Sequence, residues 1–210
     1  MSAVVRIATS VLALALVAAI LTSPVLAQPG PRELVEQTTE RMLSRLEAQR
    51  KELEAEPKRL FGMVNDIVLP HFDFVRMSRW VLGRRHWVDA SDEQKRRFVL
   101  AFRDLLVRTY ATALFEYTGQ KVNVLPLRGD PAAQGDVRVQ TEVQQSGGPT
   151  IAINYSMYQD KQGEWKVYDV SVEGVSLLSS YRSSFASEIR RSGLDALIEQ
   201  LEQRARERNG

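Results

Sequence analysis

The sequence predicts an α+β fold in which helices pack on one face of a four-stranded antiparallel sheet. Three observations predict it. Apolar residues recur at helical spacing between residues 31 and 117, they alternate with polar residues between 121 and 172, and helical spacing returns after Gly174. Because the strands follow one another without helices between them, the helices and the sheet are expected to form separate layers.

The first 27 residues are predicted to be an export signal and not part of the fold. Arg6 gives a positive start, residues 7–21 are almost wholly apolar, and Val25 and Ala27 are the small residues of a cleavage site after Ala27. An uncleaved membrane anchor is the alternative, but the apolar run is short for a span of roughly 20 residues. We therefore expect cleavage and a single soluble domain, residues 28–210, in the periplasm.

Four helices are predicted before the sheet. The first occupies residues 28–56, opens at Pro31 and buries only a narrow apolar stripe. Pro57 starts the second, which ends before Pro70 because the residue ahead of a proline disfavours the helical conformation.

The third of these helices is short and runs from Phe72 to Leu82, with Gly83 just after its C-terminus. The fourth carries the clearest signal, the capping box Ser91-Asp-Glu-Gln94. Its apolar stripe continues to Tyr117 and stops at Gly119.

The strands are predicted where apolar residues alternate with polar ones, at 122–124, at 137–143, at 151–157 and from Trp165 onward. Short turns join them, which implies an antiparallel meander with one buried face. In the last strand the apolar residues change parity between Val167 and Val170. This change predicts either a bulge near Asp169 or a strand that is covered on both faces.

Helical spacing then returns for the C-terminal part of the chain. Gly193 separates the helix that follows Gly174 from a last amphipathic helix. The charged tail, residues 204–210, is expected to fray.

Composition excludes several classes of function. The chain has no Cys, which excludes thiol nucleophiles and Cys-based metal or redox sites. Removal of Arg6 with the signal leaves 27 Lys and Arg against 26 Asp and Glu, and such a balanced chain is not a general nucleic-acid binder. His71 and His86 lie far apart without a third candidate ligand at metal spacing, so no metal site is expected. No cofactor-binding motif is present either.

Asp73 and Asp169 are the two acids that lie among apolar neighbours. Either could act as a general base in an apolar pocket, which keeps an enzyme open as an alternative. The favoured interpretation is structural. Asp73 then caps the helix that begins near Phe74, and Asp169 bonds a nearby loop or pairs with an arginine.

Large apolar and aromatic side chains are abundant in the helices and strands that must face one another. A packed core accounts for most of them, and periodicity cannot separate a core from a cavity. From the residues alone, the sequence predicts only an exported α+β domain.

Several ordered blocks of the chain resemble the MlaC family, whose members are also described as toluene-tolerance proteins or ABC-transporter auxiliary components. The similarity runs from about Leu34 to Leu201. Its blocks are Leu69-Pro-His-Phe-Asp-Phe74, Leu82-Gly-Arg84 with Trp87, Ser91-Asp-Glu-Gln-Lys-Arg-Arg-Phe98, Phe102 to Leu114, Trp165-Lys-Val-Tyr-Asp-Val170, Glu173-Gly-Val-Ser-Leu177, Tyr181-Arg-Ser-Ser-Phe185 and Gly193-Leu-Asp-Ala-Leu-Ile198.

The resemblance implies that the sheet is curved and encloses, with the helices, an apolar pocket for fatty-acyl tails. It implies a periplasmic phospholipid carrier without a cofactor, which maintains the lipid asymmetry of the outer membrane. The implied partners are an outer-membrane lipoprotein–porin complex and an inner-membrane ABC transporter with an MCE-domain subunit. A carrier of another lipid, such as a hopanoid, and a ligand-free adaptor to a transporter are alternatives.

On this basis, fourteen side chains from the helices and from one face of the sheet are expected to line the pocket: Val64, Ile67, Met77, Trp80, Phe98, Phe102, Leu105, Val139, Val143, Ile151, Ile153, Tyr155, Trp165 and Val167. Arg182 has two candidate roles, a phosphate contact at the pocket mouth or an ion pair with Asp169. The ion pair is the favoured one.

Overall fold

The computed structural model describes residues 28–207, apart from residue 128, residues 130–134 and residue 146. The predicted export signal and residues 208–210 lie outside the described residues. The elements, in chain order, are α2 (Pro31–Ala48), α3 (Arg50–Ala55), α4 (Lys58–Ile67), η1 (Leu69–His71), α5 (Phe74–Asp89), α6 (Asp92–Tyr110), η2 (Ala111–Glu116), β1 (Lys121–Val124), β2 (Asp136–Gln144), β3 (Ile151–Gln159), β4 (Trp165–Val172), β5 (Val175–Ser176) and α8 (Leu177–Glu207).

The sheet contains five antiparallel strands in the order β1-β2-β3-β4-β5, so the prediction of four strands is wrong by one. The additional strand, β5, has only two residues, and Val175 pairs with Val172 of β4. Glu173 and Gly174 make the tight turn between the strands, with φ angles of 50° and 79°. Two residues are too few to show an alternating pattern, which is why the sequence did not reveal this strand.

A bulge lies in β4, as one of the two sequence interpretations predicted. Met157 of β3 pairs with Val167, but the preceding residue, Ser156, pairs with Asp169, so that Tyr168 is the extra residue. The bulge returns Val170 to the face that already carries Val167. The apolar face of the sheet is therefore continuous along β4 despite the change of parity in the sequence.

Several helix boundaries differ from the prediction; the helix expected to continue to Tyr117, for example, is α-helical only to Tyr110 and is followed by η2. Gln49 divides the expected N-terminal helix into α2 and α3, and the break lets Leu46 and Leu53 reach the same group of buried residues. The helix predicted to end at Gly83 has a sharp kink there, with a φ of 75°, and a second helical stretch continues to Asp89. The stretch after the kink is rich in arginine, and its few apolar residues do not form a recognisable stripe.

The capping box and the break at Gly193 agree with the prediction. The Gln94 N–H donates to Ser91 Oγ at 3.1 Å, and the Ser91 N–H donates to Gln94 Oε1 at 2.9 Å. Gly193, with a φ of 85°, divides α8 into a first arm of residues 177–192 and a second arm of residues 194–207. The second arm remains helical to Glu207, although the tail was expected to fray from residue 204.

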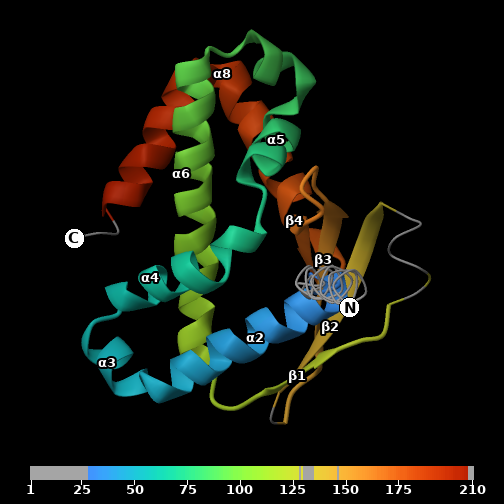
Figure 1. The fold of residues 1–210 in the computed structure, drawn as a ribbon. Coiled ribbons are helices and arrows are strands. Elements are labelled where there is room, and N and C mark those ends of the chain that lie inside the picture. The colour runs from blue at the N-terminus through green and yellow to red at the C-terminus, as the bar shows by residue number, and fades with distance from the viewer. Residues whose placement is uncertain (1–27, 128, 130–134, 146, 208–210) are drawn as a thin grey trace, which may run out of the picture.

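The helices and the sheet occupy different parts of the molecule (Figure 1). We call α5, α6 and α8 the helical lobe, which stands at one end. The sheet lies beside it, α2 crosses the sheet near β1 and β2, and α6 extends from the lobe toward α4. A bidentate ion pair fastens the lobe internally, because Arg97 of α6 donates twice to Glu202 of α8, each time at 2.9 Å.

The buried apolar residues form three clusters. The lobe cluster holds Phe98, Phe102 and their neighbours from α5, α6 and α8. The α4 cluster joins α2, α3 and α4 to Ala111. The sheet cluster packs Val35 of α2 against buried residues of β2, β3 and β4. Among the described residues, no helix is both long enough and apolar enough to span a membrane.

Candidate functional site

The region between the lobe cluster and the sheet cluster is the candidate site. A domain of this size ordinarily buries one contiguous core with small satellites. Here the three clusters are separate, and Phe72 is a partly buried side chain that packs against both the lobe cluster and the sheet cluster. Other partly buried apolar side chains border the clusters as well, among them Phe74, Leu105, Tyr155 and Val170. This arrangement concentrates incompletely covered apolar surface between the helices and the sheet.

The face of the sheet that carries Val139 is called the inner face. At one end it is fully buried, where Val139 and Met157 pack with Val35 of α2. Toward the other end the burial is incomplete, at Val143, Ile151, Ile153, Tyr155 and Val170. Register places all of these on one face, since Val143 pairs with Ile151 and Val139 pairs with Tyr155. The inner face therefore offers one closed end and one partly open, apolar end.

The fourteen predicted lining residues do not form one surface. Eight of them are buried in the clusters: Val64, Ile67, Met77, Phe98, Phe102, Val139, Trp165 and Val167. Five are partly buried: Leu105, Val143, Ile151, Ile153 and Tyr155. Trp80 is 42% exposed on α5.

The sequence interpretation missed several partly buried residues at the candidate site. Val170 was missed because its parity seemed to place it on the other face, and the bulge is what returns it. Phe72 was assigned to a helix, whereas it lies just before α5 and forms a bridge with Val167 at the edge of β4. An extended residue ahead of an N-cap aspartate is the signal that could have identified it.

Tyr155 is the polar side chain most closely associated with the inner face. Burial raises the pKa of the Tyr155 phenol, and a hydrogen bond with Thr141 acts in the opposite direction. Thr141 is itself buried, and its hydroxyl donates to the Ile153 carbonyl at 2.9 Å. The hydroxyl groups of this region therefore have partners within the sheet, which leaves hydrocarbon and ring surface toward the helices.

Asp73 and Asp169 have the structural contacts that were favoured for them. Asp73 caps α5 by accepting the Arg76 N–H at 2.8 Å, and it also accepts the Tyr158 hydroxyl. Asp169 accepts the Ser176 hydroxyl at 2.7 Å and the Leu178 N–H at 3.3 Å. Both carboxylates therefore hold local structure in place at the ends of helices.

The predicted ion pair between Arg182 and Asp169 is wrong. Arg182 instead donates to the Trp80 carbonyl at 2.8 Å, and its guanidinium carbon lies 4.9 Å from the centre of the Trp80 ring. The carboxylate is occupied by the turn that leads into α8, and the arginine is one helical turn further along that helix. Arg182 thus joins α8 to α5 near the kink at Gly83.

Metal ligands do not gather in the part of the chain that the structure describes, where no group of three His, Asp or Glu side chains could hold a metal ion. Burial and the nearby charges of Lys166 and Arg41 lower the pKa of His71. His71 lies at the end of η1, beside the sheet. Its environment favours the neutral imidazole.

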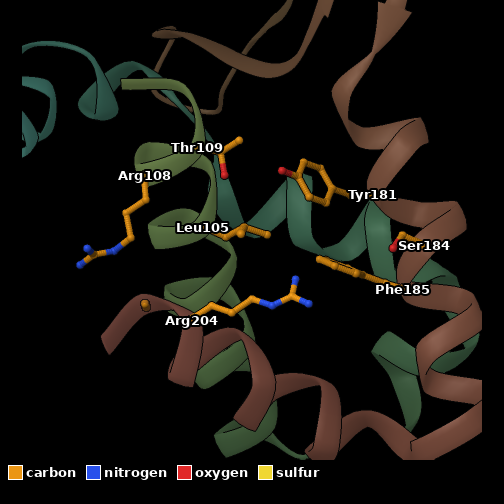
Figure 2. Close-up of a pocket in the computed structure, with 8 residues that line it drawn as sticks. Leu105, Arg108, Thr109, Tyr181, Ser184, Phe185 and Arg204 are labelled. Carbon is orange, nitrogen blue, oxygen red and sulfur yellow. The ribbon is translucent and has the colours of Figure 1, made fainter. Parts of the chain in front are cut away.

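A pocket lies within the helical lobe, and we call it the α6–α8 pocket (Figure 2). Its volume is about 370 Å³. Of the predicted lining residues, only Leu105 contributes to it, beside Tyr181 and Phe185 of α8. The pocket is bordered by two arginines, Arg108 and Arg204. It therefore differs in chemistry from the apolar inner face.

The chain is similar to proteins that are named for phospholipid transport and toluene tolerance. A family model described as MlaC protein matches residues 36–203. The intermembrane phospholipid transport system binding protein MlaC of Haemophilus influenzae is 27% identical over 200 residues, which cover 93% of this chain and 92% of that protein. The toluene tolerance protein ttg2D of Pseudomonas putida is 28% identical over 165 residues, which cover 79% of this chain and 75% of that protein.

A solved structure has the same fold. The phospholipid-binding protein of Ralstonia solanacearum, in complex with a phospholipid, is 28% identical to this chain and matches it with a TM-score of 0.76. The match covers 85% of this chain and 98% of the other. Because the family model covers most of the chain, and both the sequence and the fold agree with it, this protein belongs to the MlaC family.

Proposed function

We propose that this protein is a periplasmic carrier that holds a phospholipid by its acyl tails and shuttles it between the two membranes of the cell envelope. The observation that supports it most directly is the likeness to a phospholipid-binding protein in complex with a phospholipid. The chain is similar to the binding protein of an intermembrane phospholipid transport system, and this similarity supports transport of the lipid between two membranes. Its role is then to maintain the lipid asymmetry of the outer membrane.

The physics of acyl chains explains why a carrier is needed. Each methylene that leaves the bilayer for water costs about 0.8 kcal/mol, so two chains with about 30 methylenes favour the membrane by roughly 20 kcal/mol. A free phospholipid therefore crosses an aqueous compartment too slowly to be useful. A protein that surrounds the tails with apolar side chains removes most of that penalty.

The partly buried residues of the inner face are the ones we assign to the acyl tails. They are Val143, Ile151, Ile153, Tyr155 and Val170 from the sheet, with Phe72, which packs against both the lobe cluster and the sheet cluster. The eight buried residues of the predicted set belong to the three clusters. The support for this assignment is that apolar surface left uncovered by the protein is available to cover hydrocarbon.

The remaining parts of the proposal concern export and partners. The signal is removed after Ala27, and the protein meets an outer-membrane lipoprotein–porin complex and an inner-membrane ABC transporter with an MCE-domain subunit. No cofactor takes part. The names of the relatives, which belong to a transport system and to toluene tolerance, support this setting.

Lipid analysis tests the carrier function. The mature chain is purified from the envelope fraction of its own cells, extracted with organic solvent and analysed by mass spectrometry. We expect phospholipid at a fixed ratio to protein, and we expect delipidated protein to take up labelled phospholipid from vesicles. No lipid in repeated preparations, together with no uptake, would disprove the proposal. A hopanoid in place of phospholipid would support the alternative cargo.

A pair of substitutions on neighbouring residues of β3 tests the assigned surface. Ile153→Trp fills space on the inner face, and Asn154→Trp places the same side chain on the opposite face. We expect Ile153→Trp to reduce lipid uptake several-fold while Asn154→Trp retains it, with both variants folded by circular dichroism. Equal uptake by both variants would show that the tails lie elsewhere.

A further inference from the structure

The α6–α8 pocket has the composition of an anion site. Leu105, Arg108 and Thr109 line it from α6, and Tyr181, Ser184 and Phe185 line it from the first arm of α8. Arg204 and Ala205 close it from the second arm. Two arginines and three hydroxyl groups thus surround a floor of hydrocarbon and ring surface. None of these described lining residues is acidic.

Arg204 is the cation that reaches into this space. In Figure 2 its guanidinium extends from the second arm toward the ring of Phe185. Its neighbours Arg97 and Arg191 are bound to Glu202 and Glu188, but no carboxylate among the described residues is paired with Arg204. The arginine at the mouth of the pocket is therefore available to an anion that comes from outside the protein.

Arg108 is a second observation that favours an anion site. Its stem lines the pocket, while its guanidinium turns away from Tyr181 in Figure 2 and lies 5.5 Å from the ring centre of Phe61 on α4. There, Nε and one terminal nitrogen are buried and have no hydrogen-bond partner within the described structure. A buried guanidinium without an acceptor is unfavourable, so Arg108 gains from any anion that its flexible side chain can reach.

The hydroxyl groups complete the set of donors. Tyr181 borders the space with its hydroxyl group. Thr109 and Ser184 border the same space with hydroxyls of their own.

We propose that the α6–α8 pocket binds a phosphate group, held by Arg204 and by Arg108 after its side chain turns inward. The paired N–H groups of an arginine guanidinium can donate hydrogen bonds to two oxygens of one phosphate, and the hydroxyl groups supply further donors. A volume of about 370 Å³ lies at the small end of the range for ligand sites, and it fits a phosphate with a glycerol-sized group better than two acyl chains. The residues that line the pocket come from α6 and α8 and not from the sheet.

Titration of the mature, delipidated chain with three probes tests the site. The probes are inorganic phosphate, sn-glycerol 3-phosphate, and dihexanoyl phosphatidylglycerol below the concentration at which it forms micelles. The readout is the shift of the backbone amide signals of Ser184, Phe185 and Ala205 in NMR spectra. We expect saturable shifts at these amides.

Three substitutions that each remove one positive charge distinguish a specific phosphate site from general electrostatic attraction between phosphate and the protein. We expect Arg204→Gln and Arg108→Gln each to weaken phosphate binding by about tenfold, because each removes charge-assisted hydrogen bonds. Arg206→Gln is the matched control, since this exposed arginine lies on the same arm and does not line the pocket. It should change binding by less than about twofold.

The outcomes separate the possible sources of the phosphate. Binding of all three probes with equal dependence on Arg204 identifies a free phosphate, and binding of the two organic probes alone identifies a headgroup. Both results support the site. The absence of saturable shifts, or an equal loss in Arg204→Gln and Arg206→Gln, would overturn it. That result would leave the carrier proposal in place, because the extraction of acyl lipid tests a different surface.

Discussion

At the scale of the residue, Asp73 joins three segments of the molecule. Its carboxylate caps α5 and accepts the Tyr158 hydroxyl of β3, while its backbone N–H donates to the Val167 carbonyl of β4 at 2.9 Å. The guanidinium of Arg76 then lies against the ring of Tyr158, with its carbon 3.8 Å from the ring centre. A single side chain at the start of α5 thus fixes the helical lobe against the sheet.

We expect Asp73→Ala to lower the free energy of unfolding by about 2 kcal/mol, because it removes an N-cap and one side-chain hydrogen bond. Urea unfolding measures this change. Asp66→Ala, at an exposed position of α4, serves as the control and should cost less than about 0.5 kcal/mol. Asp73→Asn should retain lipid uptake, and a catalytic turnover that is lost in this variant while the fold persists would instead support an enzyme.

His71 predicts how stability depends on pH. Its pKa in the folded protein is lower than the usual 6.5, so the unfolded chain binds the proton more readily. The contribution of His71 is therefore complete above pH 6.5 and is lost as the pH falls from there through the lowered folded pKa. Urea unfolding at several pH values should show this slope, and His71→Gln should reduce it.

Predictions from sequence were most accurate for residues whose role is local. The capping box at Ser91 and the cap at Asp73 depend only on residues within one turn of a helix, and both are present. The partner of Arg182 depends on how two helices pack, and the sequence assigned the wrong one. Trp80 was expected in the pocket as part of the apolar set of its helix, whereas the structure leaves it 42% exposed beside that arginine.

At the scale of the element, Gly193 sets the direction of the C-terminal arm. Its φ of 85° and ψ of 171° lie in a region that residues other than glycine rarely adopt. The turn folds the second arm back so that Leu197, Ile198 and Leu201 enter the lobe cluster. It also brings Arg204 to the α6–α8 pocket.

We expect Gly193→Ala to lower the free energy of unfolding by about 1–3 kcal/mol, because the strain is in the backbone. A methyl group at this position would meet no other atom, so steric clash does not contribute. Gly62→Ala on α4 is the matched control, since a methyl group there is also free of contacts but the backbone is helical. That variant should be more stable by about 0.5–1 kcal/mol, as measured by urea unfolding.

Elements were predictable wherever their pattern was long. The four longer strands and the bulge in β4 were visible as runs of alternating residues. The fifth strand and the break at Gln49 were not, because each involves only one or two residues. Short elements are specified by turns and packing more than by periodicity.

At the scale of the whole molecule, the separation of the buried residues into three clusters is the feature most relevant to the carrier. Phe98 in the lobe and Val139 in the sheet are both fully buried, but they belong to different clusters. Periodicity alone could not show this, because it identifies an apolar face without showing what covers it. Eight of the predicted lining residues are buried in these clusters, and the prediction that they contact lipid stays a prediction.

Bound lipid should stabilise the protein measurably. A ligand that binds only the folded state raises the free energy of unfolding, by about 2.7 kcal/mol when its concentration is one hundred times the dissociation constant. We therefore expect delipidated protein to unfold at lower urea concentration than protein purified with its lipid, and restoration of lipid should reverse the change. Identical transitions in both forms would contradict a lipid that is held between the clusters.

The surplus residue in β4 has a consequence for how related chains are compared. Tyr168 adds one position to the strand without a counterpart on β3. The apolar residues before and after it therefore have different parity in the sequence, although they lie on the same face of the sheet. Removal of this one position would make the alternation in the sequence regular, and Val167, Val170 and Val172 would still lie on one face of the strand. Some relatives of this chain could lack this position. If such a relative is aligned to β4 without a gap, inward-facing residues of one chain are matched with outward-facing residues of the other over the second half of the strand.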